Sequence, residues 1–323
     1  MFVGLGFLIE YCVGPYVSYT TLAVISACAA LAFAVPFFLM PESPHYLIAK
    51  TRRKEAVEAL RWLRGNVPPH AVEREISSIE ATSKKPTGHL GGCLELVTRR
   101  GPCRALLLCL YLMFCQQLSG INAIISFSQP IFLAAHMSLS SSISPMLVGA
   151  VNCISSCFTP PLVRRFGIKN TLIGSGVGMG LCNILLSVYF YLLNSNQNVD
   201  SISVLPVICL MAYNIFFCLG IGPLPWTVAA EMFPVHLKGL ANSVIGAFAW
   251  LLAFGVMRSY NSAVLALGSF GIFLLYGLLL IVGMVGTFFM LPDTRGLSLQ
   301  DIQDLMDGRK SQELSSVDNF GYF

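Results

Sequence analysis

Long apolar runs, separated by short polar or charged stretches, set the pattern of this 323-residue chain. An α-helix needs about 20 mainly apolar residues to cross the hydrocarbon core of a membrane. The runs that come near or above that length lie at about 3–19, 21–40, 105–133, 143–163, 170–193, 202–233, 240–257 and 268–291. The pattern therefore predicts an all-α protein with about eight transmembrane helices.

A mixed, charged stretch at 45–104 separates the second run from the third. Residues 52–64 have the periodicity of an amphipathic helix, which Gly65 can end, and residues 72–82 predict a second short helix. The apolar positions expected to face inward are Ala56, Val57, Leu60 and Leu63 in the first helix, and Ile76 and Ile79 in the second. The glycines and the proline within 84–92 predict a loop.

The placement of basic residues predicts the orientation of the spans. Residues 50–104 carry twelve Lys or Arg against six Glu, whereas the loops near 134–142 and 194–201 carry no Lys or Arg. Cytoplasmic loops of membrane proteins are enriched in Lys and Arg. The charged stretch and the C-terminal tail are therefore both expected in the cytoplasm. This requires an even number of crossings between them, and six spans within 105–291 satisfy the requirement.

The composition agrees with a membrane protein and argues against several other classes. Apolar residues make up 55% of the chain and charged residues 11%, whereas a soluble domain has roughly a quarter charged residues. The eleven cysteines lie mostly in apolar runs without CxxC spacing, so we expect small apolar packers and no metal site. The sequence has no phosphate-binding loop, HExxH or Gly-x-Ser-x-Gly motif, which predicts no catalytic residues and no cofactor. The charged stretch lacks interleaved aromatic residues, which argues against nucleic-acid binding.

Four polar residues interrupt the third apolar run within seven positions: Gln116, Gln117, Ser119 and Asn122. An unsatisfied amide facing lipid costs several kcal/mol, so these side chains must face other helices or a cavity. Gly120 can bend or break the helix there and let both parts direct polar groups to one centre. Amides donate and accept hydrogen bonds, which suits a neutral polyhydroxyl substrate. The alternative is hydrogen bonding that only holds helices together, and it applies equally to Asn152 in the next run.

A second interruption falls at 220–226, where two glycines and two prolines precede Trp226. Such a sequence must loosen the helix and free backbone carbonyls, which a membrane protein tolerates only against protein or a water-filled cavity. The aromatic face of Trp226 can support the CH side of a sugar ring. The alternative is a tryptophan of the interfacial belt.

Charged residues near the cytoplasmic ends of the spans are candidates for gating ion pairs. The residues concerned are Glu42, Arg164, Arg165, Lys169, Glu231, Lys238, Asp293 and Arg295. Ion pairs of this kind can hold one face of a transporter closed and break when it opens. The alternative is ordinary juxtamembrane charge with little pairing energy.

Taken together, these segments resemble the sugar porter family of the major facilitator superfamily. The motifs that carry the resemblance are PESPHYL at 41–47, QQLSGINA at 116–123, GPLPW at 222–226, EMFP at 231–234 and PDTRG at 292–296. Residues 14–19 and 222–239 are most similar to the insect facilitated trehalose transporters. The resemblance implies a partial major facilitator fold, equivalent to helices five to twelve of a twelve-helix architecture, with the first four helices absent.

The resemblance also implies site residues and a domain organisation. The substrate-binding residues would be Gln116, Gln117, Asn122, Asn152, Trp226 and Trp250. The expected domains are the last two helices of an N-terminal bundle (1–41), a cytoplasmic helical linker (42–104), a six-helix C-terminal bundle (105–292) and a cytoplasmic tail (293–323). Transport would proceed by alternating access, with two bundles rocking around a central sugar.

This chain departs from the family pattern at several positions. His45 stands where the family usually has Arg, and Arg164 stands where it has an acid. Ser126 and Phe127 occupy positions commonly held by tyrosine, and Ala249 occupies one often held by a polar residue. We expect these differences to bear on which sugar is accepted and on the cytoplasmic ion pairs.

The expected function is facilitative transport of trehalose or a hexose. The alternatives are proton-coupled sugar symport, or a truncated non-transporting isoform or sugar sensor. The expected partners are a small neutral sugar and membrane lipid, with the oligomeric state left open. The expected location is the plasma membrane, in a multi-pass topology with a cytoplasmic C-terminus.

Overall fold

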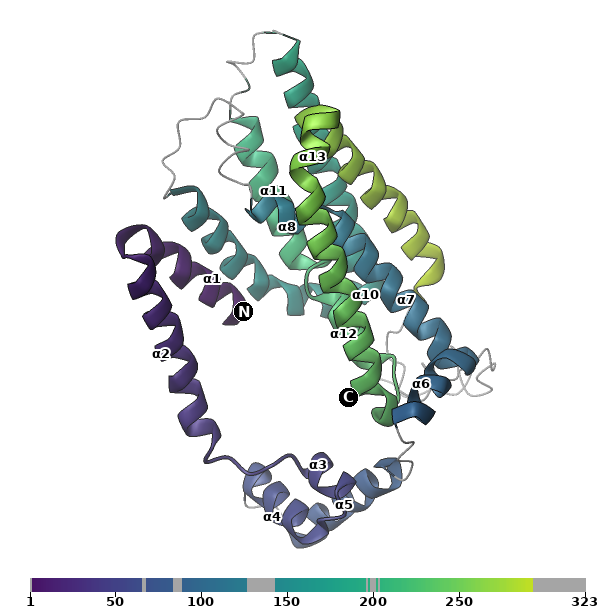
Figure 1. Cartoon of the computed structure of the whole chain (residues 1–323). Helices are drawn as coiled ribbons and strands as arrows, with labels where there is room; N and C mark the ends of the chain where they lie inside the picture. Colours follow the sequence, from purple (N-terminus) through teal and green to yellow (C-terminus); the bar gives the residue numbers. More distant parts are fainter. Residues whose placement is uncertain are drawn as a thin grey trace. The chain divides into compact units, whose positions relative to one another are not determined.

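The computed structural model describes residues 2–65, 68–83, 89–126, 143–195 and 204–292, together with residues 197 and 202. Over these residues the regular structure is helical throughout, without strands. The chain divides into two compact units (Figure 1). The first comprises Met1–Tyr16, Arg99–Phe233 and Ala241–Phe323, and the second comprises Val17–Thr98 and Pro234–Leu240.

The first unit contains the helices that carry the predicted site residues. They are α1 (Phe2–Val13) with the 3-10 turn η1 (Gly14–Tyr16), α7 (Arg100–Leu118), α8 (Ile121–Ser126), α10 (Ile143–Asn194), α11 (Leu205–Leu219), α12 (Leu224–Glu231) and most of α13 (Val235–Met290). The second unit contains α2 (Tyr19–Phe37), α3 (Pro44–Ala49), α4 (Arg53–Arg64), α5 (Pro69–Ser83) and α6 (His89–Thr98).

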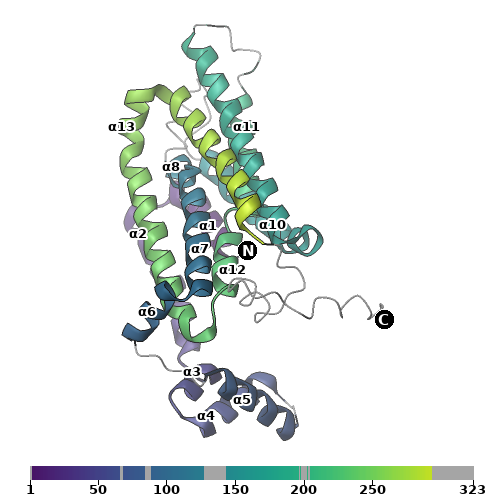
Figure 2. The same cartoon turned by 90° about the vertical axis from the view of Figure 1, so that its right-hand side faces the viewer.

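The two longest helices, α10 and α13, have 52 and 56 residues and are each divided by one glycine. Gly167 has φ 80° and ψ 166°, and Gly268 has φ 71° and ψ 168°, which glycine adopts without the steric cost that a Cβ adds. Figure 2 shows the two arms of α13 meeting at a sharp bend. Each break lies at or beside the stretch between two predicted spans, Gly167 within 164–169 and Gly268 directly after 258–267, and a single glycine makes the turn in place of a longer loop.

The predicted apolar runs are mainly helical where the structure describes them, with interruptions that include residues 119–120 and 220–223. Five described helical segments are long and apolar enough to cross a membrane, and the last of these in the chain is His236–Met290. The segments in α10 and α13 span 49 and 55 residues, which is enough for two crossings each. The structure is therefore consistent with the predicted pairs of spans in these two helices.

The second arms of α10 and α13 approach each other closely through glycine. A Cβ on Gly180 would lie 3.2 Å from the carbonyl oxygen of Gly277, and a Cβ on Gly277 would lie 3.0 Å from that of Gly180. Small residues permit this backbone approach in a membrane, where dispersion contacts favour tight packing. Beyond the glycines, Phe190 stacks on Phe273 with ring centroids 5.5 Å apart.

In the second unit, α3, α4 and α5 share a small apolar core (Figure 1). Ile76 and Ile79 are buried as predicted, and so are Ala56 and Leu60. The prediction for Leu63 was wrong, because its side chain is 56% exposed. The additional buried residues are Leu47, Ile48, Ala59 and Val72. The inward face of α4 is therefore centred nearer Ala59 than the sequence periodicity indicates.

Ion pairs join α4 to α5 on the surface of this core. Arg53 pairs with Glu73 and with Glu80, and Arg64 lies 2.7 Å from Glu75. The hydrogen bonds that Arg53 donates to the carboxylates of Glu73 and Glu80 raise its pKa above the ordinary value. Exposed pairs of this kind contribute little stability, so the apolar core carries most of the packing between the two helices.

Two helix boundaries in the second unit, the end of α4 and the start of α6, can be compared with the boundaries predicted from the sequence. Gly65 caps α4 with φ 67°, as predicted from the sequence. The loop predicted at 84–92 is wrong for its last residues, because α6 begins at His89. Residues 84–88 lie outside the described part of the chain.

Candidate functional site

Gly120 separates α7 from α8 and turns the chain between them. Its φ of 82° lies in the region that favours glycine, and a Cβ there would collide with the ring of Tyr276. The helix break predicted at this position is therefore confirmed. It places Gln116 and Gln117 on the last turn of α7 and Asn122 on the first turn of α8.

Gln116 forms hydrogen bonds with the second helix break, which is the segment between α11 and α12. Its side chain is 3% exposed, and Nε2 donates to the carbonyl oxygens of Ile221 (2.7 Å) and Gly222 (2.8 Å). These carbonyls belong to the segment between α11 and α12, and α7 packs beside α12 (Figure 2). Because both amide protons of Gln116 are engaged, only its Oε1 can serve a ligand, as an acceptor.

Other side chains satisfy the remaining polar groups of this break. The hydroxyl of Thr159 donates to the carbonyl of Cys218 (2.8 Å), and the Ile221 amide donates to Ser175 Oγ (3.1 Å). Backbone groups freed inside a membrane need such partners, because lipid supplies none. The Gly-Pro break is thus braced by α7 and by both arms of α10.

Gln117 and Asn122 form a hydrogen-bonded pair across the Gly120 turn. Asn122 Nδ2 donates to Gln117 Oε1 at 2.6 Å. The bond uses the acceptor of Gln117, so its two N–H protons stay available, and it leaves Asn122 Oδ1 as an acceptor. Gln117 is 7% exposed and Asn122 is partly buried. The pair therefore offers one donor group and one acceptor, which matches the hydrogen bonding of a hydroxyl group.

Asn152 lies in the first arm of α10 and contacts α11. The thiol of Cys218 donates to Asn152 Oδ1, and the Ser156 hydroxyl donates to the Asn152 carbonyl at 2.6 Å. This contact joins two helices, which supports the helix-packing alternative for its Oδ1. The amide Nδ2 of Asn152 keeps its donor capacity for a ligand.

The two predicted tryptophans are differently placed. Trp226 lies in the first turn of α12, four residues after Gly222, whose carbonyl Gln116 holds, and its side chain is 40% exposed. Trp250 lies in the first arm of α13 and is 69% exposed. The structure thus connects Trp226, through the braced break, to the glutamine segment. Trp250 is outside the hydrogen-bonded cluster that the described residues form.

The predicted charged residues that the structure describes lie near helix ends or, for Arg164, Arg165 and Lys169, beside the Gly167 break in α10. In the first unit, Arg164, Arg165 and Glu231 are exposed, and Lys169 Nζ lies 4.9 Å from the ring centre of Phe288. No ion pair joins Glu231 to these three basic residues in the described part of that unit. In the second unit, Glu42 is exposed and Lys238 is partly buried. Asp293 and Arg295 lie outside the described residues.

The structure adds polar residues to the cluster that the sequence analysis did not select. Tyr213 donates to the carbonyl of Ser119 at 2.9 Å, and the Ser119 hydroxyl donates to the Gln116 carbonyl at 2.6 Å. Asn214, next to Tyr213, is 4% exposed. The signal that selected Asn152, a lone amide in an apolar run, also exists at Asn214. Thr159 and Ser175 carry no comparable signal, because short hydroxyl side chains are common in membrane helices.

Comparison with known proteins gives consistent results. The family model described as "Sugar (and other) transporter" matches residues 1–306. The chain is 34% identical over 319 residues to the facilitated trehalose transporter Tret1 of Aedes aegypti, covering 98% of this chain and 39% of that protein. It is also 34% identical over 319 residues to Tret1 of Polypedilum vanderplanki, covering 98% and 63%. The chain thus spans less than two thirds of the length of these relatives.

Solved structures share the same fold. The proton:xylose symporter XylE bound to 6-bromo-6-deoxy-D-glucose matches with a TM-score of 0.73 at 21% identity, covering 94% of this chain and 64% of that one. The inward open conformation of XylE from E. coli matches with a TM-score of 0.68 at 20% identity, covering 94% and 63%. The predicted partial major facilitator fold is therefore confirmed, and so is the resemblance to the sugar porters.

Proposed function

Because the chain belongs to the sugar transporter family, we propose that it transports a small neutral sugar across a membrane by alternating access. The observation that carries the proposal is the pair Gln117 and Asn122, joined at 2.6 Å, which keeps one donor group and one acceptor available. Each hydroxyl of a sugar can accept from the first and donate to the second. The relatives are named as transporters, in keeping with a protein that is not an enzyme.

The substrate is neutral in this proposal because the cluster offers amides instead of charges. Gln117 contributes Nε2, Asn122 contributes Oδ1 and Asn152 contributes Nδ2, and Gln116 adds Oε1 as a further acceptor. Groups of this kind bind hydroxyls without the desolvation cost that a buried ion carries. The face of Trp226 supports the apolar CH side of the ring, and Trp250 contributes from α13. Trehalose is the first candidate, since similar proteins carry that substrate in their names.

The proposed transport is facilitative, with substrate moving down its gradient. The residues at 1–41 and 105–292 act as parts of two bundles, and residues 42–104 act as a cytoplasmic linker. The charges at Arg164, Arg165 and Glu231, with the others expected at the cytoplasmic ends, form ion pairs in one conformation and separate in another. The protein resides in the plasma membrane with residues 293–323 in the cytoplasm.

Uptake by the purified 323-residue chain in proteoliposomes tests the proposal. We expect saturable uptake of labelled trehalose or glucose that excess unlabelled sugar abolishes. Facilitative transport also predicts that collapsing an imposed proton gradient leaves the initial rate unchanged. A rate no higher than that of empty liposomes would contradict sugar transport, and a rate that follows the proton gradient would contradict facilitative transport.

A further inference from the structure

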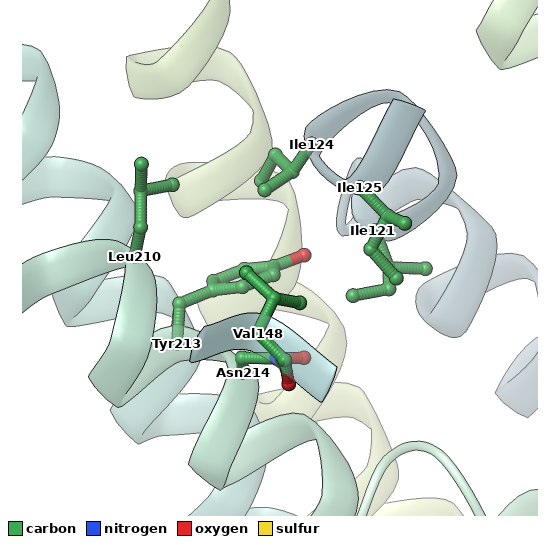
Figure 3. A pocket seen from close by; sticks show the side chains of 7 residues that line it. All are labelled: Ile121, Ile124, Ile125, Val148, Leu210, Tyr213 and Asn214. Atoms are coloured by element: carbon green, nitrogen blue, oxygen red, sulfur yellow. Dashed lines mark hydrogen bonds between the residues drawn. The ribbon is translucent and has the colours of Figure 1, made fainter. Parts of the chain in front are cut away.

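A small apolar pocket of about 20 Å³ lies between α8, α10 and α11 in the first unit (Figure 3). Three isoleucines of α8 form one side, and Val148 of α10 and Leu210 of α11 form the others. Tyr213 and Asn214 of α11 complete the lining. Tyr213 already donates its hydroxyl proton to Ser119. Asn214 is therefore the polar lining residue whose hydrogen-bonding partners remain to be accounted for.

Asn214 has one amide atom in use and one without a partner. Its Nδ2 donates to the carbonyl oxygen of Val148 at 3.3 Å. A carbonyl can only accept, so the amide nitrogen must face Val148, and the orientation of the side chain follows. Its Oδ1 is buried and finds no hydrogen-bond partner among the residues that the structure describes. Buried acceptors without a donor are rare, and each calls for a specific partner.

The pocket lies one helical turn from the candidate sugar site. Asn214 is four residues before Cys218 on α11, and Val148 is four residues before Asn152 on α10. Residues four apart share a helix face, about 5.4 Å along the axis for one turn. The contact of Asn214 with Val148 and that of Cys218 with Asn152 therefore follow one another along the same α10–α11 groove. A sugar held at Asn152 can reach the pocket with one substituent.

The chemistry of the pocket defines the substituent that fits. Its walls are aliphatic apart from Tyr213, and its one unpartnered atom is an acceptor. The complement is a short apolar group that ends in a hydroxyl donor. A water molecule fits less well, because it needs two or more polar partners and the aliphatic walls supply none. We propose that Asn214 Oδ1 accepts the hydroxyl of a sugar hydroxymethyl arm, whose CH₂ group packs against the isoleucines.

This proposal rests on the proposed sugar transport and makes it more specific. A site that binds the hydroxymethyl arm distinguishes hexoses and their disaccharides from 6-deoxyhexoses. The 6-deoxy analogue has no hydroxyl at this position and leaves the buried acceptor without a donor. Asn214 is then a specificity-determining residue. Its effect is largest on the ratio of affinities for a sugar and its 6-deoxy form.

Equilibrium binding to the 323-residue chain in lipid nanodiscs measures that ratio. The probes are glucose and 6-deoxyglucose, and trehalose and 6,6′-dideoxytrehalose. We expect the wild-type chain to bind each deoxy form about tenfold more weakly than its parent, as for one lost hydrogen bond. Asn214→Leu keeps the branched shape of the side chain and has no acceptor, so we expect it to bind parent and deoxy form equally. A ratio within one variant is insensitive to the fraction of folded protein.

Thr171→Val is the matched control. The Oγ1 atom of Thr171 is also buried without a partner in the described part of the chain, and it does not line this pocket. The variant should keep the wild-type ratio. Equal binding of parent and deoxy forms by the wild-type chain would overturn the role of Asn214 and leave sugar transport standing. An unchanged ratio in Asn214→Leu would overturn it too, whereas binding of neither parent sugar would contradict the proposed function itself.

Discussion

Gln116 and Gln117 are neighbours in the sequence, and their amides have different partners. Gln116 Nε2 donates both of its protons in hydrogen bonds to the carbonyls of Ile221 and Gly222. Gln117 accepts from Asn122 and keeps its own protons. Hydrogen bonding that only holds helices together, the alternative raised for this segment, therefore describes the amide nitrogen of Gln116. The ligand-binding hypothesis applies best to Gln117 and Asn122.

Asn122→Leu tests the acceptor of this pair. The variant removes Oδ1 and leaves Gln117 without its donor, so we expect the Kd for labelled trehalose or glucose to rise about tenfold, equivalent to roughly 1–2 kcal/mol. Equilibrium binding to the chain in nanodiscs gives the value. Asn194→Leu, at the exposed end of α10, is the control and should bind as the wild type does. An unchanged Kd in Asn122→Leu would leave Asn122 a purely structural role.

Most of the polar residues selected from the sequence were grouped together or placed beside a helix break, and Asn152, a lone amide, was added through the family resemblance. Asn214 was not selected as a site residue, because the sequence alone does not show which neighbouring helix a lone amide in an apolar run contacts. Its partner, the carbonyl of Val148, is 66 residues away in the chain. The same holds for Thr159 and its bond to the Cys218 carbonyl. Hydrogen bonds between distant helices depend on how the helices pack, so no local sequence pattern predicts them.

At the scale of elements, the braced break between α11 and α12 yields a prediction on stability. Gln116→Ala leaves the carbonyls of Ile221 and Gly222 without their donor, which should cost about 2–4 kcal/mol. We expect a lower midpoint of thermal unfolding, measured in detergent by circular dichroism. Gln117→Ala is the neighbouring control, since it deletes no brace of the break. Equal midpoints for the two variants would show that Gln116 does not hold this segment.

The turn between α7 and α8 gives a second prediction at this scale. Gly120→Ala combines a positive φ with a collision against Tyr276, so we expect a destabilisation of about 1–3 kcal/mol. Gly246→Ala, in a helical part of α13 with open space around it, should be neutral or slightly stabilising. The unfolding midpoints of the two variants make the comparison. A Gly120→Ala protein as stable as Gly246→Ala would mean that the turn does not need glycine.

The elements could be predicted from the sequence to different degrees. The breaks at Gly120 and at 220–223 were predicted because glycine and proline interrupt apolar runs there. For α10 and α13, the charged and polar residues near Arg164 and Arg258 indicated an interruption, but not that one glycine alone, Gly167 or Gly268, makes each turn. A single glycine with positive φ can reverse the chain without any loop, and only the backbone conformation shows that it does.

At the scale of the whole molecule, family and fold could be predicted because several separate motifs occur in the family order. The family model that covers residues 1–306 and the structural match over 94% of the chain agree with that prediction. The chain spans 39% of the mosquito relative and 64% of the symporter chain, so a whole protein of this family holds more than the segments described. The sugar identity cannot be predicted at this scale, because it depends on single positions such as Asn214.

In the proposed mechanism, the pair Gln117 and Asn122 holds the transported sugar. The most direct test measures initial rates of labelled trehalose and glucose uptake by proteoliposomes that contain the wild-type chain or Gln117→Ala. We expect saturable uptake by the wild type and about a tenfold higher KM for the variant, with the maximal rate per folded protein little changed. A wild-type rate equal to that of empty liposomes would contradict sugar transport by this chain. The same KM in both proteins would contradict sugar binding by Gln117.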